Sequence, residues 1–358
     1  MKICTTSVVT FVQIAATLEA APPQYLVTDL GPAGSSTQSG TINSFGQVAG
    51  SVSDINSRAV IWNGSFPTFL GAPSGGTQSA AGGNNNVGQV VGLAFSLSNT
   101  VSRAVLWNGT TPTDLGAGAA FQINDSGQIA GILIGTTRAG AVRWDGTTPI
   151  ELNSPAGTSS AAYGINSAGQ VIGHIIGADE VYHATVWTGT TPTILGSLGG
   201  LTLAYGINEA GQVAGLSDIA AGETHAVLWT GTTPLDLGLL APGGYSTASA
   251  VNSFGDVVGL ASSVSYDMED PLYNGFIYTG GTMYNLNSFL LTDMDVLVVG
   301  ANGINDAGMI AAYGMIEGQR HALLLTPTPE PGSIALLLCG AVLLNFRRRR
   351  NEQNGRNA

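Results

Sequence analysis

The stretch "GINEAGQVAG" (residues 206–215) repeats, almost letter for letter, the stretch "GINSAGQVIG" (residues 164–173). Aligned on one glycine, the same pattern occurs seven times, with that glycine at Gly46, Gly88, Gly127, Gly169, Gly211, Gly255 and Gly308. The intervals lie between 39 and 53 residues. A recurring period near 40 residues is typical of proteins built from stacked structural repeats. The sequence therefore predicts a repeat architecture.

An Asn-x-x-Gly motif marks every repeat. The asparagines are Asn43, Asn85, Asn124, Asn166, Asn208, Asn252 and Asn305, each three residues before its glycine. An asparagine side chain can bond its own backbone two residues further on, and glycine accepts a positive φ. The motif therefore predicts a tight β-hairpin turn with a structural role, as at Asn43 and Gly46 or at Asn208 and Gly211.

Four short strands are predicted in each repeat. A strand such as residues 212–215 follows the first turn, and a third apolar stretch ends in an aromatic residue. A second turn, usually "xGTTP", leads to a fourth stretch that ends in Asp-Leu-Gly or a variant, as at residues 236–238. Four strands in about 42 residues form the pattern of a β-propeller blade.

The aromatic residues at the end of the third strands are Trp62, Trp107, Trp144, Trp187, Trp229 and Tyr278. A residue that recurs in every unit usually serves the packing between units, so we interpret this position as packing between blades. The alternative is that the tryptophans stack against carbohydrate.

The two ends of the repeat region complement one another. The last unit stops after its third strand, at Leu325, while "YLVTDLG" (residues 25–31) precedes the first Asn-x-x-Gly motif. The N-terminal strand would therefore supply the missing fourth strand and remove the open sheet edges. The predicted fold is an all-β, seven-bladed propeller over residues 22–326. A β-solenoid with two rungs per unit is the alternative, and it would not need this offset.

The charge of the chain excludes one class of partner. Charged residues make up 9% of the 358 residues, and residues 22–328 hold twenty Asp and Glu against five Arg. This balance is unsuited to nucleic acid, which requires Lys and Arg against phosphate. It suits a self-repelling surface outside the cytoplasm. Both cysteines, Cys4 and Cys339, lie near the ends, so the body has no disulfide framework.

The N-terminus has the features of an export signal. Met1 and Lys2 precede an apolar and small-residue stretch over residues 3–18, which ends at "EAAPP" (residues 19–23). A charged start, an apolar centre and a small-residue exit are the parts of a secretory signal peptide, predicted here over residues 1–21. An N-terminal strand is the alternative.

The C-terminal segment, residues 327–358, has three parts in order. Its motif is Pro329, Glu330, Pro331, Gly332 and Ser333; an apolar run over residues 334–346 and the basic cluster Arg347, Arg348, Arg349 and Arg350 follow. As a helix the run reaches ~20 Å, against ~30 Å of hydrocarbon. It spans a bilayer only if the bilayer thins or the arginines snorkel. The arginines would stay cytoplasmic and leave the body outside.

This tail resembles the PEP-CTERM sorting signal, in which a Pro-Glu-Pro motif precedes a short transmembrane helix and a basic cluster. The resemblance covers about thirty residues. It implies that an exosortase of an exopolysaccharide-producing Gram-negative bacterium processes the chain. It also implies transient anchoring in the inner membrane, followed by a place on the cell surface or in the extracellular matrix. A plain tail anchor is the alternative.

The repeats also resemble the HAF family of bacterial extracellular repeats, through His183-Ala184, His225-Ala226 and His321-Ala322. The third residue is not Phe in any of them, and the resemblance implies only an extracellular location. Equivalent positions of a ring lie on different blades. We therefore interpret the three histidines as structural, rather than as metal ligands or catalytic groups.

Acidic insertions break the repeat in the sixth unit. Asp267, Glu269 and Asp270 lie in a long loop between its second and third strands, and Asp293 and Asp295 lie in its connection to the next unit. Both insertions are expected on one face of the ring, and function concentrates on such loops. Hard cations take several carboxylate oxygens, so we predict a Ca²⁺ or ligand site there; no other cofactor is expected. A solvated acidic loop is the alternative.

The predicted function is that of a non-catalytic propeller at the cell surface, which binds exopolysaccharide or another surface component through one loop face. The first alternative is a polysaccharide lyase or glycoside hydrolase whose acids are among Asp267, Asp270, Asp293 and Asp295. The second is a structural spacer.

Overall fold

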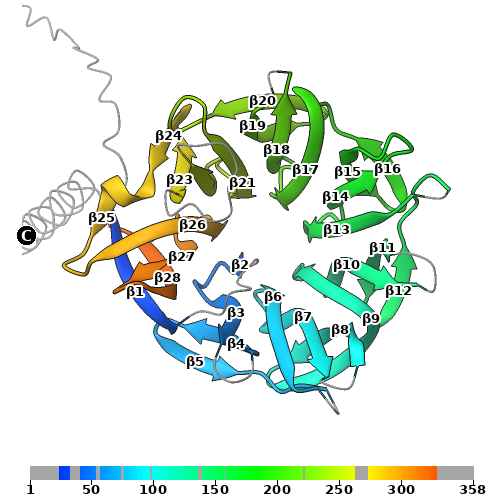
Figure 1. Cartoon of the computed structure of the whole chain (residues 1–358). Coiled ribbons are helices and arrows are strands. Elements are labelled where there is room, and N and C mark those ends of the chain that lie inside the picture. The colour runs from blue at the N-terminus through cyan, green and yellow to red at the C-terminus, as the bar shows by residue number, and fades with distance from the viewer. Residues whose placement is uncertain are drawn as a thin grey trace, which may run out of the picture.

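The chain forms an all-β propeller, in which strands surround a central axis (Figure 1). The computed structural model describes residues 24–32, 41–53, 57–73, 76–96, 99–135, 139–156, 158–220, 222–262 and 273–328. Apart from the short 3-10 helix η1 (Leu286–Phe289), the regular elements of these ranges are strands. The propeller prediction is confirmed, and the β-solenoid alternative is wrong.

Each sheet runs outward from the axis. The innermost strands are β2 (Thr41–Ile42), β6 (Gln78–Asn84), the second half of β9 (Thr111–Ile123), β13 (Ser160–Ile165), β17 (Gly199–Ile207), β21 (Tyr245–Val251) and β26 (Val296–Ile304). The second strands are β3 (Val48–Ser53), β7 (Gln89–Ser96), β10 (Gln128–Ile134), β14 (Val171–Ile176), β18 (Val213–Ile219), β22 (Val257–Ser262) and β27 (Ile310–Ile316).

The outer half of each sheet repeats this regularity. The third strands are β4 (Ser57–Asn63), β8 (Asn99–Asn108), β11 (Ala139–Asp145), β15 (Tyr182–Thr188), β19 (Thr224–Thr230), β23 (Tyr273–Thr279) and β28 (Gln319–Pro327). The outermost strands are β5 (Phe66–Phe69), the first half of β9, β12 (Thr148–Glu151), β16 (Thr191–Ile194), β20 (Thr233–Gly238), β24 (Thr282–Asn285) and β1 (Tyr25–Pro32).

Hydrogen bonding joins two of these four-stranded groups into one sheet. Strand β9 pairs with β8 through residues 111–117 and with β10 through residues 118–123, so the described strands include a seven-stranded sheet from β6 to β12. Four other sheets have four strands each. The remaining sheet has the order β25-β1-β28-β27-β26, in which β25 is the short strand Leu290–Leu291.

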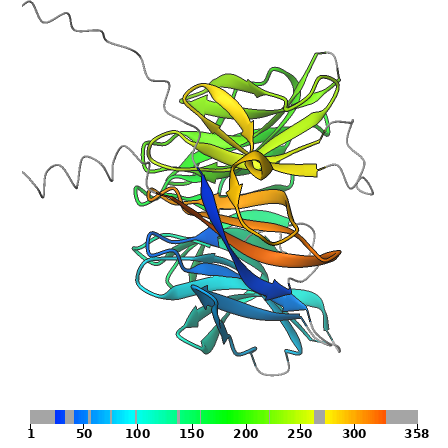
Figure 2. The same cartoon turned by 90° about the vertical axis from the view of Figure 1, so that its left-hand side faces the viewer.

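The N-terminal strand closes the ring. Strand β1 pairs antiparallel with β28 from Tyr25 opposite Pro327 to Pro32 opposite His321, with one irregularity after Asp29 (Figure 2). The first described strand thus follows β28 as the fourth strand of the last sheet, as the sequence predicts, and the two-residue strand β25 pairs with its other edge.

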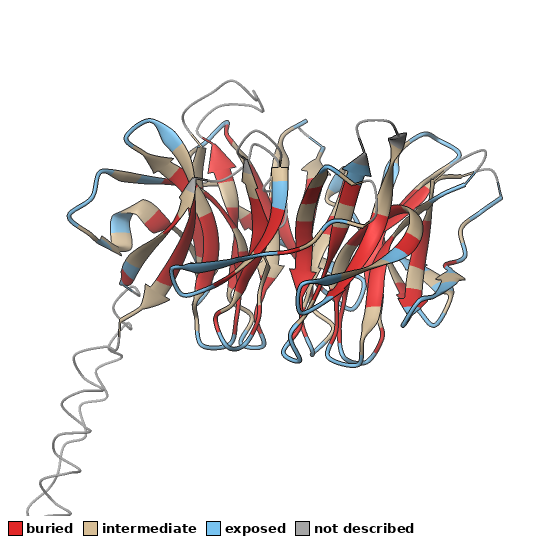
Figure 3. Cartoon of the chain, turned by 90° about the horizontal axis from the view of Figure 1, so that it is seen from below, coloured by how far each residue is buried: buried red, intermediate tan, exposed pale blue. Residues whose placement is uncertain are grey.

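The ring has two different faces (Figure 3). We call the end that bears the Asn-x-x-Gly turns the turn face; it also bears the hairpins between third and fourth strands. The opposite end, the loop face, bears the connections between second and third strands and those from one sheet to the next. Because strands alternate in direction, β28 begins on the loop face at Gln319 and ends on the turn face at Pro327.

Hydrophobic packing between neighbouring sheets forms the core. Buried side chains of the described residues form seven clusters, each shared by two neighbouring four-stranded groups, and one of these clusters lies within the seven-stranded sheet. The five tryptophans are at most 1% exposed. A glycine on the neighbouring second strand of the same sheet makes room for several of them. A β-carbon at Gly131 would lie 2.7 Å from the Trp144 ring, and one at Gly215 would lie 2.9 Å from the Trp229 ring.

The interpretation of the tryptophans as packing residues is therefore confirmed, and the carbohydrate-stacking alternative is wrong for them because no sugar reaches a buried indole. Three of them also bond across sheets. Trp187 Nε1 donates to the carbonyl of Asn153 at 2.8 Å, Trp229 donates to Gly196 at 2.7 Å, and Trp107 donates to Gly71. At the sixth position Tyr278 also packs against such a cluster but is half-buried, and the fully buried aromatic of that sheet is Phe276.

The predicted turns form at all seven motifs. Each glycine has a φ between +72° and +85°, and each donates its N–H to the carbonyl of the asparagine. The asparagine Oδ1 accepts from the turn, as Asn166 does from the Gln170 N–H at 3.0 Å. The asparagines are only 2–6% exposed although they sit at hairpin tips.

The asparagines also bond to one another's backbone around the axis. Six Nδ2 groups donate to the carbonyl of the next asparagine at 2.8–3.3 Å: Asn43 to Asn85, Asn85 to Asn124, Asn124 to Asn166, Asn166 to Asn208, Asn208 to Asn252, and Asn305 to Asn43. Between the last two motifs, the Ser253 N–H and Oγ donate to the Asp306 carboxylate at 2.8 and 2.9 Å. We call the seven motif asparagines, Asn43, Asn85, Asn124, Asn166, Asn208, Asn252 and Asn305, the asparagine belt.

The predicted terminal signals are not part of this ring. Residues 1–21 and 329–358 lie outside the described residues, so the signal peptide and the sorting signal remain predictions. Within the described ranges, no helix combines the length and the apolarity needed to cross a membrane.

The belt yields a stability prediction. The change Asn166→Asp keeps the shape and the accepting oxygen but removes both Nδ2–H donors, which bond Gln170 Oε1 and the Asn208 carbonyl. It also places a charge where only 2% of the residue is exposed. We expect a loss of ~2–3 kcal/mol in the free energy of unfolding, measured by urea denaturation.

The matched control is Asn153→Asp at an exposed position, which should stay within ~0.5 kcal/mol of the wild type. Equal, small effects of the two substitutions would contradict a structural role for the belt.

Candidate functional site

The acidic site predicted from the sequence is not assembled by the described residues. Asp267, Glu269 and Asp270 lie outside them. Asp293 and Asp295 are exposed in the segment between β25 and β26. Among the described residues, no three His, Cys, Asp or Glu side chains gather as metal ligands. The Ca²⁺ site therefore stays a prediction.

The three repeat-position histidines each pair with a carboxylate in their own sheet. His321 Nδ1 lies 2.8 Å from Asp29, His225 Nδ1 lies 2.9 Å from Asp236, and His183 Nε2 lies 3.3 Å from Asp179. In another sheet the same position holds Arg103, which bonds Asp114. These pairs support the structural interpretation of the histidines.

An aromatic cluster that the sequence analysis did not single out joins the innermost strands of three neighbouring sheets. Phe121 on β9, Tyr163 on β13 and Tyr205 on β17 belong to successive innermost strands, and their ring centroids are 5.3 and 5.9 Å apart. The Tyr163 ring also lies 5.5 Å from His174, which lies 4.8 Å from Tyr182. We call these five residues the aromatic cluster.

The cluster extends from the inner strands to the loop face. Tyr182 is the first residue of β15, at the loop-face end, and is 36% exposed. Phe121, Tyr163 and Tyr205 are half-buried. Aromatic faces with a few polar groups among them are the usual lining of ligand sites.

His174 is the polar centre of this cluster. It is 7% exposed, and its Nδ1 has no hydrogen-bond partner among the described residues. Burial lowers the pKa of His174 from 6.5 to about 4, because the apolar surroundings disfavour the imidazolium. Burial likewise raises the pKa of the Tyr163 hydroxyl. Near neutral pH His174 and Tyr163 are therefore uncharged, and the buried Nδ1 of His174 has no hydrogen-bond partner among the described residues.

The sequence did contain a signal for this cluster. Phe121, Tyr163 and Tyr205 stand 42 residues apart, each three residues before the belt asparagine. The corresponding positions in the other repeats are Gly40, Gly82, Ser249 and Asn302. This position is aromatic in three adjacent repeats and small or polar in the other four, so it does not follow the repeat. His174 is likewise the only histidine of the sequence that lies outside the repeat position of His183, His225 and His321.

A shallow cavity of about 220 Å³ lies at the centre of the turn face, above the asparagine belt. Three carboxylates line it, and each is bonded by the preceding turn. The Asn86 N–H donates to Asp125 at 2.8 Å, as the Ser253 N–H does to Asp306, and the Ser167 N–H donates to Glu209 at 3.0 Å. These carboxylates stabilise the contact between turns and keep some acceptor capacity.

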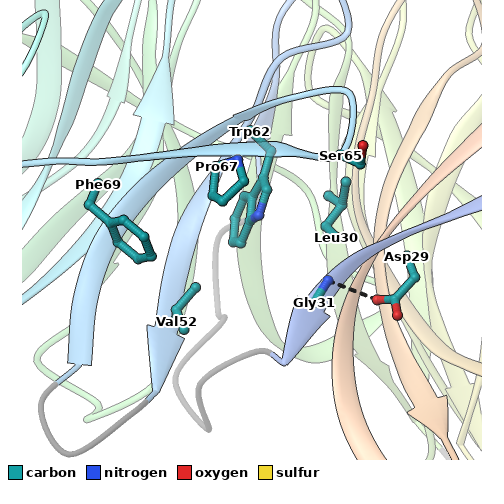
Figure 4. A pocket seen from close by; sticks show the side chains of 8 residues that line it. All are labelled: Asp29, Leu30, Gly31, Val52, Trp62, Ser65, Pro67 and Phe69. Carbon is teal, nitrogen blue, oxygen red and sulfur yellow. Dashed lines mark hydrogen bonds between the residues drawn. The ribbon is translucent and has the colours of Figure 1, made fainter.

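A larger cavity of about 380 Å³ lies where β1 meets β4 and β5 (Figure 4). Trp62, Phe69 and Leu30 line it, and Trp62 Nε1 is buried with no partner among the described residues. The equivalent indoles elsewhere donate to a carbonyl after the fourth strand. Here that position is Gly31, whose φ of +100° and N–H bond to Asp29 give the backbone another course. Because Trp144, which faces Gly116 with a φ of +113°, is also unpartnered, this feature follows from the strand ending rather than from a ligand.

The comparisons with known proteins support the fold. The β-propeller domain of the Trilobed protease from Pyrococcus furiosus matches with a TM-score of 0.54 at 8% identity, over 84% of this chain and 93% of that one; it is described as having an open velcro topology. The acylaminoacyl peptidase of Pyrococcus horikoshii matches with a TM-score of 0.51 at 9% identity, over 87% of this chain. The match covers 53% of that peptidase, so the chain spans about half its length.

At these identities the likeness shows a shared β-propeller fold and nothing about activity. No model of a protein family and no curated protein matches the sequence.

The buried His174 yields a pH prediction. Its folded pKa is lowered, so protonation favours the unfolded chain, and its contribution to stability is lost as pH falls from 6.5 towards 4. The change His174→Leu introduces the residue found at the equivalent Leu216 and removes this titration. Between pH 7 and pH 4.5, the drop in unfolding free energy should be smaller in the variant by ~2–3 kcal/mol. Urea denaturation at both pH values measures it, and parallel drops in both proteins would refute the assignment.

Proposed function

We propose that the chain is an exported, exosortase-processed protein of the cell surface or extracellular matrix, whose propeller binds a glycan without catalysis. The ligand is an exopolysaccharide or another surface saccharide, and it binds at the aromatic cluster. Export and sorting rest on the residue patterns at the two ends of the chain. The observation that carries the binding role is the group of four aromatic rings, of which Tyr163 and Tyr182 lie against the buried, uncharged His174.

The proposal includes a ring of seven blades. The seven-stranded sheet counts as two blades, because β9 changes partner from β8 to β10 at residue 118. This count of seven blades agrees with the seven hydrophobic core clusters and with the seven Asn-x-x-Gly motifs. Phe121, Tyr163 and Tyr205 then belong to the third, fourth and fifth blades.

A saccharide fits this surface chemically. Sugar rings have apolar C–H faces and polar edges, so they pack against aromatic faces while their hydroxyls seek hydrogen-bond partners. The hydroxyl of the half-buried Tyr163, whose pKa is raised by burial, supplies a neutral polar group at the cluster, and the uncharged His174 lies buried beside it. Neutral groups suit an uncharged ligand, and the acidic surface of the chain disfavours a strongly anionic one.

The test is a glycan array, with and without Ca²⁺, probed with purified residues 22–328, followed by titration of any glycan that binds. Replacement of Tyr163 by Leu should weaken that binding about tenfold, which corresponds to ~1.4 kcal/mol. The Ca²⁺ condition tests the predicted acidic site separately, because Asp293 and Asp295 are not among the residues of the cluster.

The matched control is Tyr284→Leu. Tyr284 is a half-buried tyrosine on β24 that packs against Phe289 at 5.6 Å, outside the cluster. It should leave glycan affinity unchanged. Silence across neutral and acidic glycans would overturn the binding role and favour the spacer alternative, and equal losses in both variants would place the ligand elsewhere.

A further inference from the structure

Four apolar side chains project from the turn face. Phe45 is 71% exposed, Phe66 is 78% exposed, Val87 is 66% exposed and Phe254 is 76% exposed. Each sits at or directly after a hairpin tip, where the repeat needs no apolar group. We call these four residues the apolar tips.

The repeats themselves show that these residues are unusual. At the position of Phe45, Val87 and Phe254, the other motifs have Ser126, Ala168, Ala210 and Ala307. At the position of Phe66, the other hairpins have Thr111, Thr148, Thr191, Thr233 and Thr282. The turns therefore fold with small or polar residues, and folding does not account for large apolar ones that remain in water.

The apolar tips surround the point where the described chain ends. Strand β28 ends at Pro327 on the turn face, next to Gly308: a β-carbon there would lie 3.4 Å from Pro327. Phe254 belongs to the sheet on one side of β28, and Phe45 and Phe66 belong to the sheet on the other side. Val87 lies one sheet further on. The far side of the ring has Ser126, Ala168 and Ala210 instead.

The sequence beyond this point limits how far the ring can move from a membrane. Only residues 329–333 separate the last described residue, Thr328, from the apolar run that begins at Ile334. Six residue steps reach at most ~20 Å when fully extended. With the run in a bilayer, the turn face near β28 must therefore stay within that distance of the lipid surface.

We propose that the turn face is a membrane-docking surface, on which the apolar tips Phe45, Phe66, Val87 and Phe254 insert into the interface of a lipid bilayer. Phenylalanine and other apolar residues at such an interface bury their side chains at the boundary of headgroups and acyl chains. This inference rests on the proposed function, in that the C-terminal sorting signal would anchor the chain in the membrane before exosortase processes it. It adds an orientation: the loop face and the exposed end of the aromatic cluster point away from the membrane.

The orientation can be measured on the full chain in vesicles of zwitterionic phosphatidylcholine and phosphatidylethanolamine. Cys4 and Cys339 are replaced by Ser, and single cysteines at positions 45, 66 and 254 carry a nitroxide spin label. The control position is Gln319, which is exposed at the loop-face end of the same strand, β28. Collision rates with oxygen, which concentrates in lipid, and with a water-soluble nickel chelate report the surroundings of each label.

Vesicle binding should raise the ratio of oxygen to nickel collisions several-fold at positions 45, 66 and 254 and leave position 319 unchanged. As a second measurement, a label at position 87 should lose its lipid exposure when Phe45→Ser, Phe66→Ser and Phe254→Ser are combined. Because all three side chains are exposed, the thermal midpoint of that variant should match the wild type.

The outcomes separate the two proposals. If the chain floats with vesicles but the turn-face labels remain as accessible to nickel as position 319, the docking surface is overturned and the anchoring stands. If the chain does not float with vesicles, both are overturned. A label at position 87 that stays in lipid despite the triple substitution would also overturn the role of the three phenylalanines.

Discussion

The asparagine belt is the interaction on which the rest of the ring depends. In six of the seven motifs one side chain does two tasks: Oδ1 accepts the turn's own N–H groups, and Nδ2 donates to the carbonyl of the next belt asparagine. The first task shapes a hairpin and the second joins neighbouring sheets at the axis, where the inner strands converge. Because the amides are buried, each missing bond would leave a polar group without water. Turn formation and ring assembly are therefore coupled.

Away from the axis, packing and strand exchange hold the ring together. The tryptophans fill the space between neighbouring sheets, and glycines on the adjacent strand of each tryptophan's own sheet leave room for the indole rings. The closing contact is the pairing of β1 with β28, which joins the first and last described strands and is reinforced by the Asp29–His321 bond at 2.8 Å. A closed ring leaves no terminal repeat, so no sheet face needs a separate cap.

Much of this arrangement could be predicted from the sequence because the same motif occurs seven times in it. Turn, strand order, aromatic position and the complementary termini each follow from local chemistry. The belt bonds could not be predicted, because they depend on the distance between residues about 42 positions apart in the chain. The depth of the sixth aromatic could not be predicted either: two aromatics, Phe276 and Tyr278, occur on one strand, and in the structure Phe276 is fully buried while Tyr278 is half-buried against the same cluster.

The candidate site was harder to predict than the fold. Sequence reasoning emphasised Asp293 and Asp295, which are conspicuous charges but are exposed in the structure. It did not select Tyr163 and His174, because the ring contacts of a histidine with the two adjoining strands cannot be read from spacing. The turn face carries the closing belt and the end of β28, and the loop face carries the variable connections. Under the two proposals made above, the turn face would serve attachment and the loop face would serve recognition.

Hydrogen exchange at the seven turn glycines tests the belt most directly. Their N–H groups lie at hairpin tips, where local fraying usually gives low opening free energies. If the belt couples the turns, the amides of Gly46, Gly88, Gly127, Gly169, Gly211, Gly255 and Gly308 should all exchange with one free energy, close to that of global unfolding. A wide spread, with individual turns opening far below the global value, would contradict the account.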